Sequence, residues 1–417
     1  MKPLLLSQSD SSGGAARAAL RLHKALLKSG TDSRMRVGVR NSDLATVEGP
    51  TGKLAKAIGV VRPHFGGLLM HLQKSPNRVL HSPTVLPSGL VTSLSASTAD
   101  VINLQWINNE FLAIEEIGRL RKPIVWTLHD MWAFCGAEHY APDDMDARWR
   151  RGYLRGNRPD GHHGLDVDRW TWARKRRAWH HRMHLVAPSR WLFECIRGSA
   201  LLNENPVRVI PNALDMGQFQ PWPKGLARQV LGLPPDPRLV IFGALGGGAD
   251  PRKGWDLLQA ALARIASQIP GIEAVVFGQS EPANSPQLGL PMHWLGHLND
   301  DATLALAYSA ADLMVVPSRQ DNLPQAGTEA QACGCPVVAF NCTGLPDVVA
   351  DRQTGYLAEP YDPEDLTNGM RWILEDRDRH GQLSAAARAR AVALWAEEVV
   401  VSQYLGVYRE AIDAARG

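Results

Sequence analysis

Two acidic residues, Asp321 and Glu329, stand eight positions apart, and between them lies the short turn Asn322-Leu323-Pro324. Pro324 suits the first turn of a helix, where no amide partner is lost, and Asn322 can cap that helix. Carboxylates accept hydrogen bonds from the vicinal hydroxyls of a sugar. The pair therefore predicts a site for a polyol. The alternative is a capping acid followed by a surface glutamate.

A second candidate is the glycine-rich stretch GALGGGADPRKGWDLL at 243–258, which follows an apolar strand and precedes a helix. It is not a Walker sequence, because Ala249 stands where the lysine should be. Arg252 and Lys253 lie at the helix start, where cations oppose the helix dipole. A bound anion would offset this repulsion, so the stretch predicts an anion site. The alternative is a solvated basic turn.

Two weaker candidates lie in the first half of the chain. Gly13 and Gly14 leave bare backbone at a helix start, although a tight turn without ligand would look the same. His129 and Asp130 end an apolar strand, which is where ligand sites lie in open α/β sheets. Histidine is the usual acid or base near neutral pH. The alternative is a histidine that only caps its strand.

The elements that must position these residues are apolar strands that alternate with amphipathic helices. This alternation predicts an α/β protein with two parallel sheets and helical crossovers. Residues 221–238, rich in proline and basic side chains, are interpreted as the linker between them. The strands are expected in PLLLSQ, RMRVGV, DVINLQW, PIVWTLHD, HLVAPS and VRVIPN, and then in LVIFGAL, IEAVVFG, MHWLGH, DLMVVPS and PVVAF.

The predicted domains are 1–215, carrying a basic Trp-rich insert at about 141–182, and 216–394, with a C-terminal helix at 395–417 returning to the first domain. A length of 417 residues and 21% charged side chains fit two globular domains. No apolar stretch approaches the roughly 18 residues of a membrane span, so a cytoplasmic protein is expected.

Metal binding is not expected from local spacing. The five cysteines lack the paired spacing of a zinc site and fit small buried thiols better than disulfides. The three Asp-x-Asp triplets, at 144–146, 166–168 and 376–378, lie in polar contexts, and they are interpreted as solvated. The same interpretation applies to the His-His pairs at 162–163 and 180–181.

Residues 141–190 contain twelve Lys/Arg against six Asp, whereas the whole chain has a net charge of only +3. Five tryptophans are interleaved with these charges over 141–191. Basic side chains with interfacial aromatics suit an anionic membrane surface. An exposed charged insert with core tryptophans is an equal alternative. Nucleic acid is not expected as a partner, because no RNA-binding motif accompanies the charge.

An ordered set of short stretches covers nearly the whole chain and resembles one known family, the family-4 retaining glycosyltransferases of the GT-B fold. The resemblance is closest to the bacterial exopolysaccharide branch of the colanic-acid type. It implies two Rossmann-like parallel-sheet domains that face each other across a cleft. The stretches are SSGGAARAALRLHKAL, DVINLQWIN, WTLHDMWAF, VAPSRWL, VIPNALD, DPRKG, LGHLND, YSAADLMVVPSRQDNLPQ, EAQACGCPVVAF and GLPDVV.

The resemblance assigns roles to the residues in the second domain. The family carries two glutamates at the positions of Asp321 and Glu329. The first contacts donor-sugar hydroxyls, helped by the turn that follows it, and the second holds the ribose. Asp321 is a departure, since its side chain is one methylene shorter, and this bears on which sugar is bound. Arg252 and Lys253 match the pair that holds the diphosphate.

In the first domain, the resemblance implies that the amides at Gly13 and Gly14 approach the diphosphate. His129 matches a histidine over the donor sugar, and Asp130 would orient His129 or the acceptor. The implied reaction moves a sugar, without metal and with retention, from a UDP or GDP sugar to a glycan or lipid-linked glycan. The basic, Trp-bearing insert would allow such a cytoplasmic enzyme to dock at the inner face of the membrane and reach a lipid-linked acceptor. The alternatives are a non-catalytic nucleotide-sugar-binding scaffold and a nucleotide-sugar epimerase of the same fold.

Overall fold

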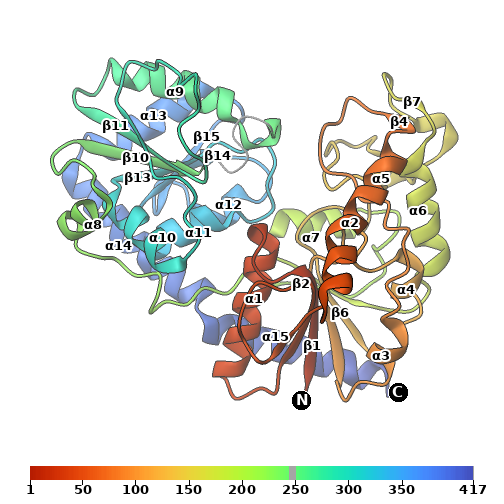
Figure 1. The fold of residues 1–417 in the computed structure, drawn as a ribbon. Coiled ribbons are helices and arrows are strands. Elements are labelled where there is room, and N and C mark those ends of the chain that lie inside the picture. The colour runs from red at the N-terminus through yellow and green to blue at the C-terminus, as the bar shows by residue number, and fades with distance from the viewer. Residues whose placement is uncertain (244–249, 417) are drawn as a thin grey trace. The chain divides into compact units, whose positions relative to one another are not determined.

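A computed structural model describes residues 1–243 and 250–416, and the chain divides into two units (Figure 1). Unit 1 comprises residues 1–213 and 400–417, and unit 2 comprises residues 214–399. The sequence had placed these boundaries at 215 and 394. Among the described residues, none of the helices combines the length and the apolar character that spanning a bilayer requires.

Unit 1 is built on a seven-stranded sheet in the order β3-β2-β1-β5-β6-β8-β9. Every neighbouring pair is parallel, as the alternation of strands and helices predicts. The carboxyl ends of these strands therefore share one edge of the sheet. The strands are β1 (Pro3–Ser9), β2 (Arg34–Val39), β3 (Val47–Glu48), β5 (Val101–Leu104), β6 (Ile124–Thr127), β8 (His184–Ala187) and β9 (Val207–Val209).

Helices and a small two-stranded antiparallel sheet complete unit 1. A two-stranded antiparallel pair joins β4 (Gln73–Lys74) to β7 (His163–Gly164). The last helix, α15 (Glu397–Ala414), packs Tyr404 and Tyr408 into the core around the sheet. The others are α1 (Gly13–Lys28), α2 (Lys53–Met70), α3 (Val91–Ser95), α4 (Ile114–Ile117), α5 (Arg148–Arg151), η1 (Arg155–Asn157), α6 (Val167–Ala178) and α7 (Arg190–Arg197).

Unit 2 contains a six-stranded, all-parallel sheet in the order β12-β11-β10-β13-β14-β15. Its strands are β10 (Arg238–Gly243), β11 (Ile272–Phe277), β12 (Met292–Trp294), β13 (Leu313–Val316), β14 (Val337–Phe340) and β15 (Gly355–Ala358). Its helices are α8 (Lys224–Leu231), η2 (Pro251–Lys253), α9 (Trp255–Ala266), α10 (Asp301–Ala310), α11 (Gln325–Ala332), α12 (Leu345–Val348), α13 (Pro363–Leu374) and α14 (Arg377–Trp395).

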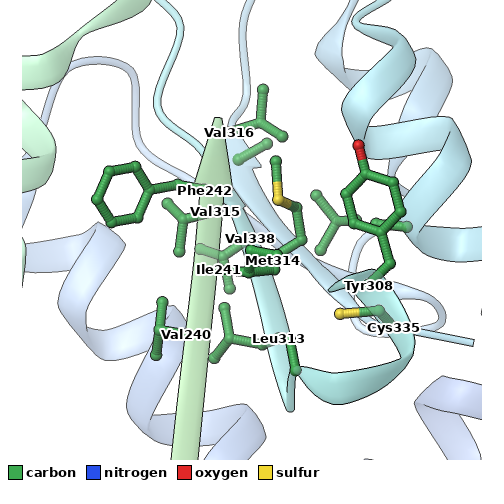
Figure 2. Close-up of a cluster of buried hydrophobic side chains, with 14 of the residues drawn as sticks. Val240, Ile241, Phe242, Tyr308, Leu313, Met314, Val315, Val316, Cys335 and Val338 are labelled. Atoms are coloured by element: carbon green, nitrogen blue, oxygen red, sulfur yellow. The ribbon is translucent and has the colours of Figure 1, made fainter. Parts of the chain in front are cut away.

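The core of unit 2 forms around the two central strands, β10 and β13. Figure 2 shows apolar side chains of both strands, such as Ile241 and Val315, beside the ring of Tyr308 and the thiol of Cys335. All five cysteines are free thiols, and Cys342 alone is not buried. The prediction of thiols rather than disulfides is therefore confirmed.

The interpretation of residues 221–238 as a linker is wrong. This segment contains α8 and belongs to unit 2. Arg228 of α8 is buried and pairs with Asp312 at 3.0 Å, and it also donates to the carbonyl oxygen of Ala310. The proline and basic residues that resemble a linker are thus tied down by hydrogen bonds that local composition does not reveal.

A buried histidine on α1 gives unit 1 a pH-dependent stability. The His23 ring hydrogen-bonds Ser33 and Thr46, and its burial lowers its pKa to about 4. Between pH 6.5 and 4 the unfolded chain therefore binds more protons than the folded one, and stability is lost as the pH falls. A shift of this size corresponds to roughly 3 kcal/mol. We expect the urea concentration at the midpoint of unfolding to fall as the pH is lowered from 7 to 4. The fall should be smaller in His23→Gln than in the control His180→Gln.

Candidate active site

Two loops of unit 2 bring together the predicted phosphate and sugar residues. One follows β10 and contains η2, and the other runs from β13 to α11; β10 and β13 are neighbours in the sheet. Lys253 Nζ lies 2.6 Å from Asp321 Oδ2, although 68 positions separate them. Asp321 is nearly buried, whereas about half of the Lys253 side chain is exposed. A cation and a carboxylate thus meet at the carboxyl edge of the sheet.

The cations at this helix start have partners within the protein. Arg252 Nη2 lies 2.6 Å from Asp250 Oδ2, and Asp250 also accepts from the Arg252 amide at 3.1 Å. From the sequence alone, these cations are expected to need a bound anion that offsets the helix dipole. Asp250 and Asp321 supply negative charge, so the dipole alone does not require a ligand. The glycine-rich turn that precedes them, residues 244–249, lies outside the described residues.

Arg319 joins the two loops and was not anticipated from the sequence. Its guanidinium makes a bidentate pair with Asp256 on α9 at 2.7 and 2.6 Å. Its amide donates to the Arg252 carbonyl oxygen at 2.6 Å. Gly254, at φ +66°, has no room for a side chain, because a Cβ would lie 2.0 Å from the Pro317 carbonyl oxygen. These contacts fix the position of Lys253 relative to Asp321.

The turn between the two acids differs from its predicted form. Helix α11 begins at Gln325 with Pro324 as its N-cap residue, so Asn322 does not cap it. Instead the turn packs against Gly344, where a Cβ would lie 1.4 Å from the Asn322 carbonyl oxygen. Asn322 and Leu323 are buried, and the Asn322 amide donates to Asp321 Oδ1 at 3.0 Å. The turn is therefore a rigid support for Asp321.

Glu329 lies on α11, within the buried part of the helix. Its Oε2 accepts a hydrogen bond from the Tyr308 hydroxyl at 2.9 Å. The Tyr308 ring packs edge-on against Phe277 at the end of β11, and Figure 2 shows the ring beside the core strands. Tyr308 is a positioning residue that the sequence did not reveal, because its helix reads as an ordinary buried one.

In unit 1, His129 follows β6 and is held by a chain of polar side chains. Its Nε2 lies 2.8 Å from Gln105 Oε1, and the Gln105 amide donates to Asn103 and Thr127 at 2.7 and 3.2 Å. Gln105 therefore accepts from the Nε2–H tautomer. Burial lowers the pKa of His129 to about 4, so the ring is neutral at pH 7.

The C-terminal helix supports this chain of side chains. The Tyr408 hydroxyl donates to Asn103 Oδ1 at 2.9 Å, and the Tyr404 hydroxyl lies 3.0 Å from Thr127 Oγ1. The sequence indicated the helix but gave no sign of these contacts, which span about 300 positions of the chain.

Asp130 accepts hydrogen bonds from three groups around it. They are Trp106 Nε1 at 3.0 Å, the Trp132 amide at 2.9 Å and His139 Nδ1 at 2.6 Å. Burial would raise the pKa of Asp130, but His139 and these donors hold it below its ordinary value. The ionised carboxylate thus organises the loop after β6.

Gly13 and Gly14 begin α1 directly after β1, as the sequence predicted. Gly13 has φ +84°, which glycine adopts without strain. Both residues are exposed, and space is open around the Cβ position of Gly13. The backbone here can approach a ligand closely.

Most tryptophans of the basic insert lie in the core of unit 1 and not on its surface. Trp149, Trp172 and Trp179 lie in the core of unit 1, while Trp170 is exposed. Several of its arginines are neutralised within the unit, in the ion pairs Arg148–Asp166, Arg150–Asp143 and Arg174–Glu115. The expectation of an aromatic membrane surface over 141–191 is therefore wrong for most of its tryptophans.

Two family models match the chain. Glycosyltransferase Family 4 matches residues 12–218, and Glycosyl transferases group 1 matches residues 224–390. One model falls on each sheet, and the second includes Arg252, Lys253, Asp321 and Glu329. Two parallel-sheet units, each matched by a glycosyltransferase family model, define the GT-B fold of glycosyltransferases. The chain belongs to the family-4, group 1 glycosyltransferases, a retaining family.

Curated relatives match about half of the chain. A D-inositol 3-phosphate glycosyltransferase of Segniliparus rotundus is 33% identical over 216 residues, which is 49% of this chain and 47% of that protein. That of Mycolicibacterium smegmatis is 32% identical over 204 residues, 46% of this chain and 45% of that protein. The chain spans about half the length of the curated relatives it matches.

Solved structures resemble the whole chain at low identity. Sucrose-phosphate synthase from Thermosynechococcus elongatus has a TM-score of 0.67 at 20% identity and covers 99% of this chain and 100% of its own. Anabaena Alr3699/HepE in complex with UDP-glucose has a TM-score of 0.64 at 19% identity, with coverages of 99% and 100%. These likenesses confirm the predicted fold.

Proposed function

We propose that this protein is a retaining glycosyltransferase that moves a sugar from a nucleoside-diphosphate sugar to a hydroxyl of a glycan or lipid-linked glycan. The observation that carries this proposal is the meeting of Lys253 with Asp321 at the carboxyl edge of the unit 2 sheet. Glu329 lies on the helix that begins just after Asp321. This edge is where open α/β sheets bind their ligands.

The Lys253–Asp321 pair suits a site that opens for its ligand. Lys253 is half exposed, so a diphosphate oxygen can take the place of the Asp321 carboxylate on its ammonium. Asp321 is then released to accept hydrogen bonds from the hydroxyls of the sugar. Arg252 adds a second cation beside the first. Fixed cations aimed at the leaving diphosphate stabilise the negative charge that develops there.

In the proposed reaction, the bond between the anomeric carbon and the diphosphate oxygen breaks. The bond to the acceptor oxygen forms on the same face, and a leaving phosphate oxygen takes the acceptor proton. Neutral His129 would contact the donor sugar, and the amides at Gly13 and Gly14 would approach the diphosphate.

UDP-glucose is the first donor to test, because the similar Anabaena HepE was solved with it. GDP sugars are the second choice. Asp321 is one methylene shorter than the glutamate of the family, so we propose that it reaches the sugar through a different hydroxyl or a bridging water. We propose that the reaction belongs to bacterial exopolysaccharide synthesis, because the ordered sequence stretches resemble that branch of the family. We also propose that it takes place in the cytoplasm.

A peripheral membrane contact, if the acceptor is lipid-linked, fits α2 better than the basic insert. Leu54, Ile58, Val61, Phe65 and Leu68 recur at helical spacing along α2, and all are exposed. An apolar face of this kind can enter the headgroup region of a bilayer.

We expect the protein to pellet with anionic phospholipid vesicles at low salt, and Leu68→Ser to pellet less. Val230→Ser, a matched exposed substitution on α8, should behave as wild type. A wild type that stays in the supernatant at low salt would exclude the contact.

The proposal is tested by thermal shift with UDP, GDP, ADP and their common sugars, with and without chelator. A ligand at a hundred times its dissociation constant stabilises by about 2.7 kcal/mol, which is readily measured. We expect one nucleotide to stabilise the protein under both conditions. If none does, the protein has no nucleotide site of its own and the proposal fails. A shift that requires Mg²⁺ or Mn²⁺ contradicts metal-independent binding.

A further inference from the structure

Three segments of unit 1 that are far apart in the sequence place a histidine and two carboxylates together. They are His81, Glu138 and Asp168, and one ligand atom from each lies within 4.8 Å of the others. His81 and Glu138 face each other in an isolated antiparallel bridge, and Asp168 lies in the first turn of α6. The proposed donor site uses none of them.

The tautomer of His81 is fixed by its surroundings. Its Nδ1 lies 2.7 Å from the Val79 carbonyl oxygen, so Nδ1 carries the hydrogen and Nε2 presents a lone pair. Nε2 is buried, lies 3.8 Å from Asp168 Oδ1 and has no hydrogen-bond partner among the described residues. A lone pair directed at a carboxylate is repulsive unless a positively charged species lies between them.

Glu138, on the other side of the cluster, also has a buried polar atom without a hydrogen-bond partner among the described residues. The residue is 6% exposed, and the atom is its Oε2. Its other oxygen, Oε1, accepts from the Tyr153 hydroxyl. A buried carboxylate oxygen without a partner is costly beside a second carboxylate, so the pair calls for a proton or a cation.

Other groups hold the carboxylates without occupying this space. Gln73 Nε2 donates to Asp168 Oδ2 at 2.5 Å, and the Ala137 amide lies 3.3 Å from Oδ1. The buried amine of Lys175 donates to carbonyl oxygens, including that of Gly136 at 2.7 Å, rather than to either carboxylate. At Gly136 a Cβ would lie 2.6 Å from Glu138 Oε2, so only glycine leaves the cluster room.

We propose that His81 Nε2, Glu138 Oε2 and Asp168 Oδ1 bind a divalent transition-metal ion such as Zn²⁺. One imidazole with two carboxylates is a suitable ligand set, and Val79, Tyr153 and Gln73 supply the hydrogen bonds that orient metal ligands. Bonds of about 2.0–2.2 Å in a tetrahedral site set ligand atoms about 3.4 Å apart. Since the three atoms now lie within 4.8 Å of one another, each would move by less than about 1 Å to reach that spacing.

The site would support the loop that carries Asp130. The residues that follow two of the ligands, Ser82 and His139, hydrogen-bond each other at 2.8 Å, and His139 also contacts Asp130. The two segments thus meet twice. His81 and Glu138 form the first pair and supply metal ligands, and Ser82 and His139 form the next pair, which supports Asp130. The role inferred for the ion is structural, which is compatible with a transfer step that needs no metal.

The test uses the full chain without a histidine tag, stripped with chelator and dialysed against limiting Zn²⁺. We expect one Zn²⁺ per wild-type chain by elemental analysis, a rise in melting temperature on binding, and Co²⁺ absorption bands when Co²⁺ replaces Zn²⁺. His81→Gln and Glu138→Gln should bind at least tenfold more weakly. Tyr153→Phe, which removes an orienting hydrogen bond, should bind about 10–100-fold more weakly.

His180→Gln is the matched control, because it removes an exposed histidine by the same substitution. It should bind Zn²⁺ as the wild type does. If the stripped wild type takes up no more Zn²⁺ than His81→Gln, the site binds no metal and a proton neutralises the carboxylates. Equal binding by all variants would also overturn the proposal. Should Glu138→Gln fail to fold, His81→Gln and Tyr153→Phe decide between these results.

Discussion

Lys253→Ala is expected to lower the turnover of the nucleotide sugar about a hundredfold to a thousandfold. Removing one donor aimed at the developing charge of a transition state typically costs about 2.7–4 kcal/mol of barrier. Lys253 is the half-exposed cation at the carboxyl edge of the unit 2 sheet, 2.6 Å from Asp321. The measurement is the steady-state release of nucleoside diphosphate, followed by chromatography at saturating donor.

A structural effect must be separated from this catalytic one, because Asp321 is nearly buried and loses its partner in Lys253→Ala. The double variant Lys253→Ala/Asp321→Asn removes both charges and should recover stability without recovering turnover. Lys74→Ala, an exposed lysine of unit 1, is the control and should leave turnover unchanged. Near-normal turnover in Lys253→Ala would contradict the assignment of this residue to the diphosphate.

Glu329→Ala is expected to weaken nucleotide binding about a hundredfold. Hydrogen bonds to charged groups contribute about 1.5–3 kcal/mol each, and a carboxylate can accept from both hydroxyls of a ribose. Glu329 is held in place by the Tyr308 hydroxyl, which donates to its Oε2 at 2.9 Å. Calorimetric titration of the nucleotide into wild type and variant measures the loss.

The 2′,3′-dideoxy nucleotide supplies the internal control for this effect. It should bind the wild type about as weakly as the ribonucleotide binds Glu329→Ala, and the variant should not distinguish the two. Tyr308→Phe should show a smaller loss, since it removes only the group that orients Glu329. If Glu329→Ala binds both nucleotides as the wild type does, Glu329 has no contact with the ribose.

The fold could be predicted because its strands are strongly apolar and alternate with helices. All eleven expected strands are present in two parallel sheets. The strands that the sequence missed are β3, β4, β7 and β15, which are short, glycine-containing or only partly buried. Helix α8 was missed because proline and basic residues surround it. Its Arg228 is held by Asp312, which lies far from it in the sequence and is brought near only by folding.

The site could be predicted only where its residues form local patterns. Asp321 with Glu329, and Arg252 with Lys253, are close in sequence and lie at element ends. The contacts that hold these residues could not be predicted, because folding brings their partners together from separate segments. The partners are Arg319, Tyr308 and, for His129, Gln105. The metal cluster is the clearest case, since its three ligands come from segments about 30 and 60 positions apart, a spacing that matches no sequence motif.

The proposed activity is the transfer of a sugar from a nucleoside-diphosphate sugar. The most direct measurement is the release of nucleoside diphosphate from the donor that binds, with water or a bacterial glycolipid extract as acceptor. We expect steady release of diphosphate by the wild type, faster release with the extract, and a product of retained anomeric configuration. A wild type that binds the donor but releases no more diphosphate than Lys253→Ala would contradict it, and an isomerised sugar would identify an epimerase instead.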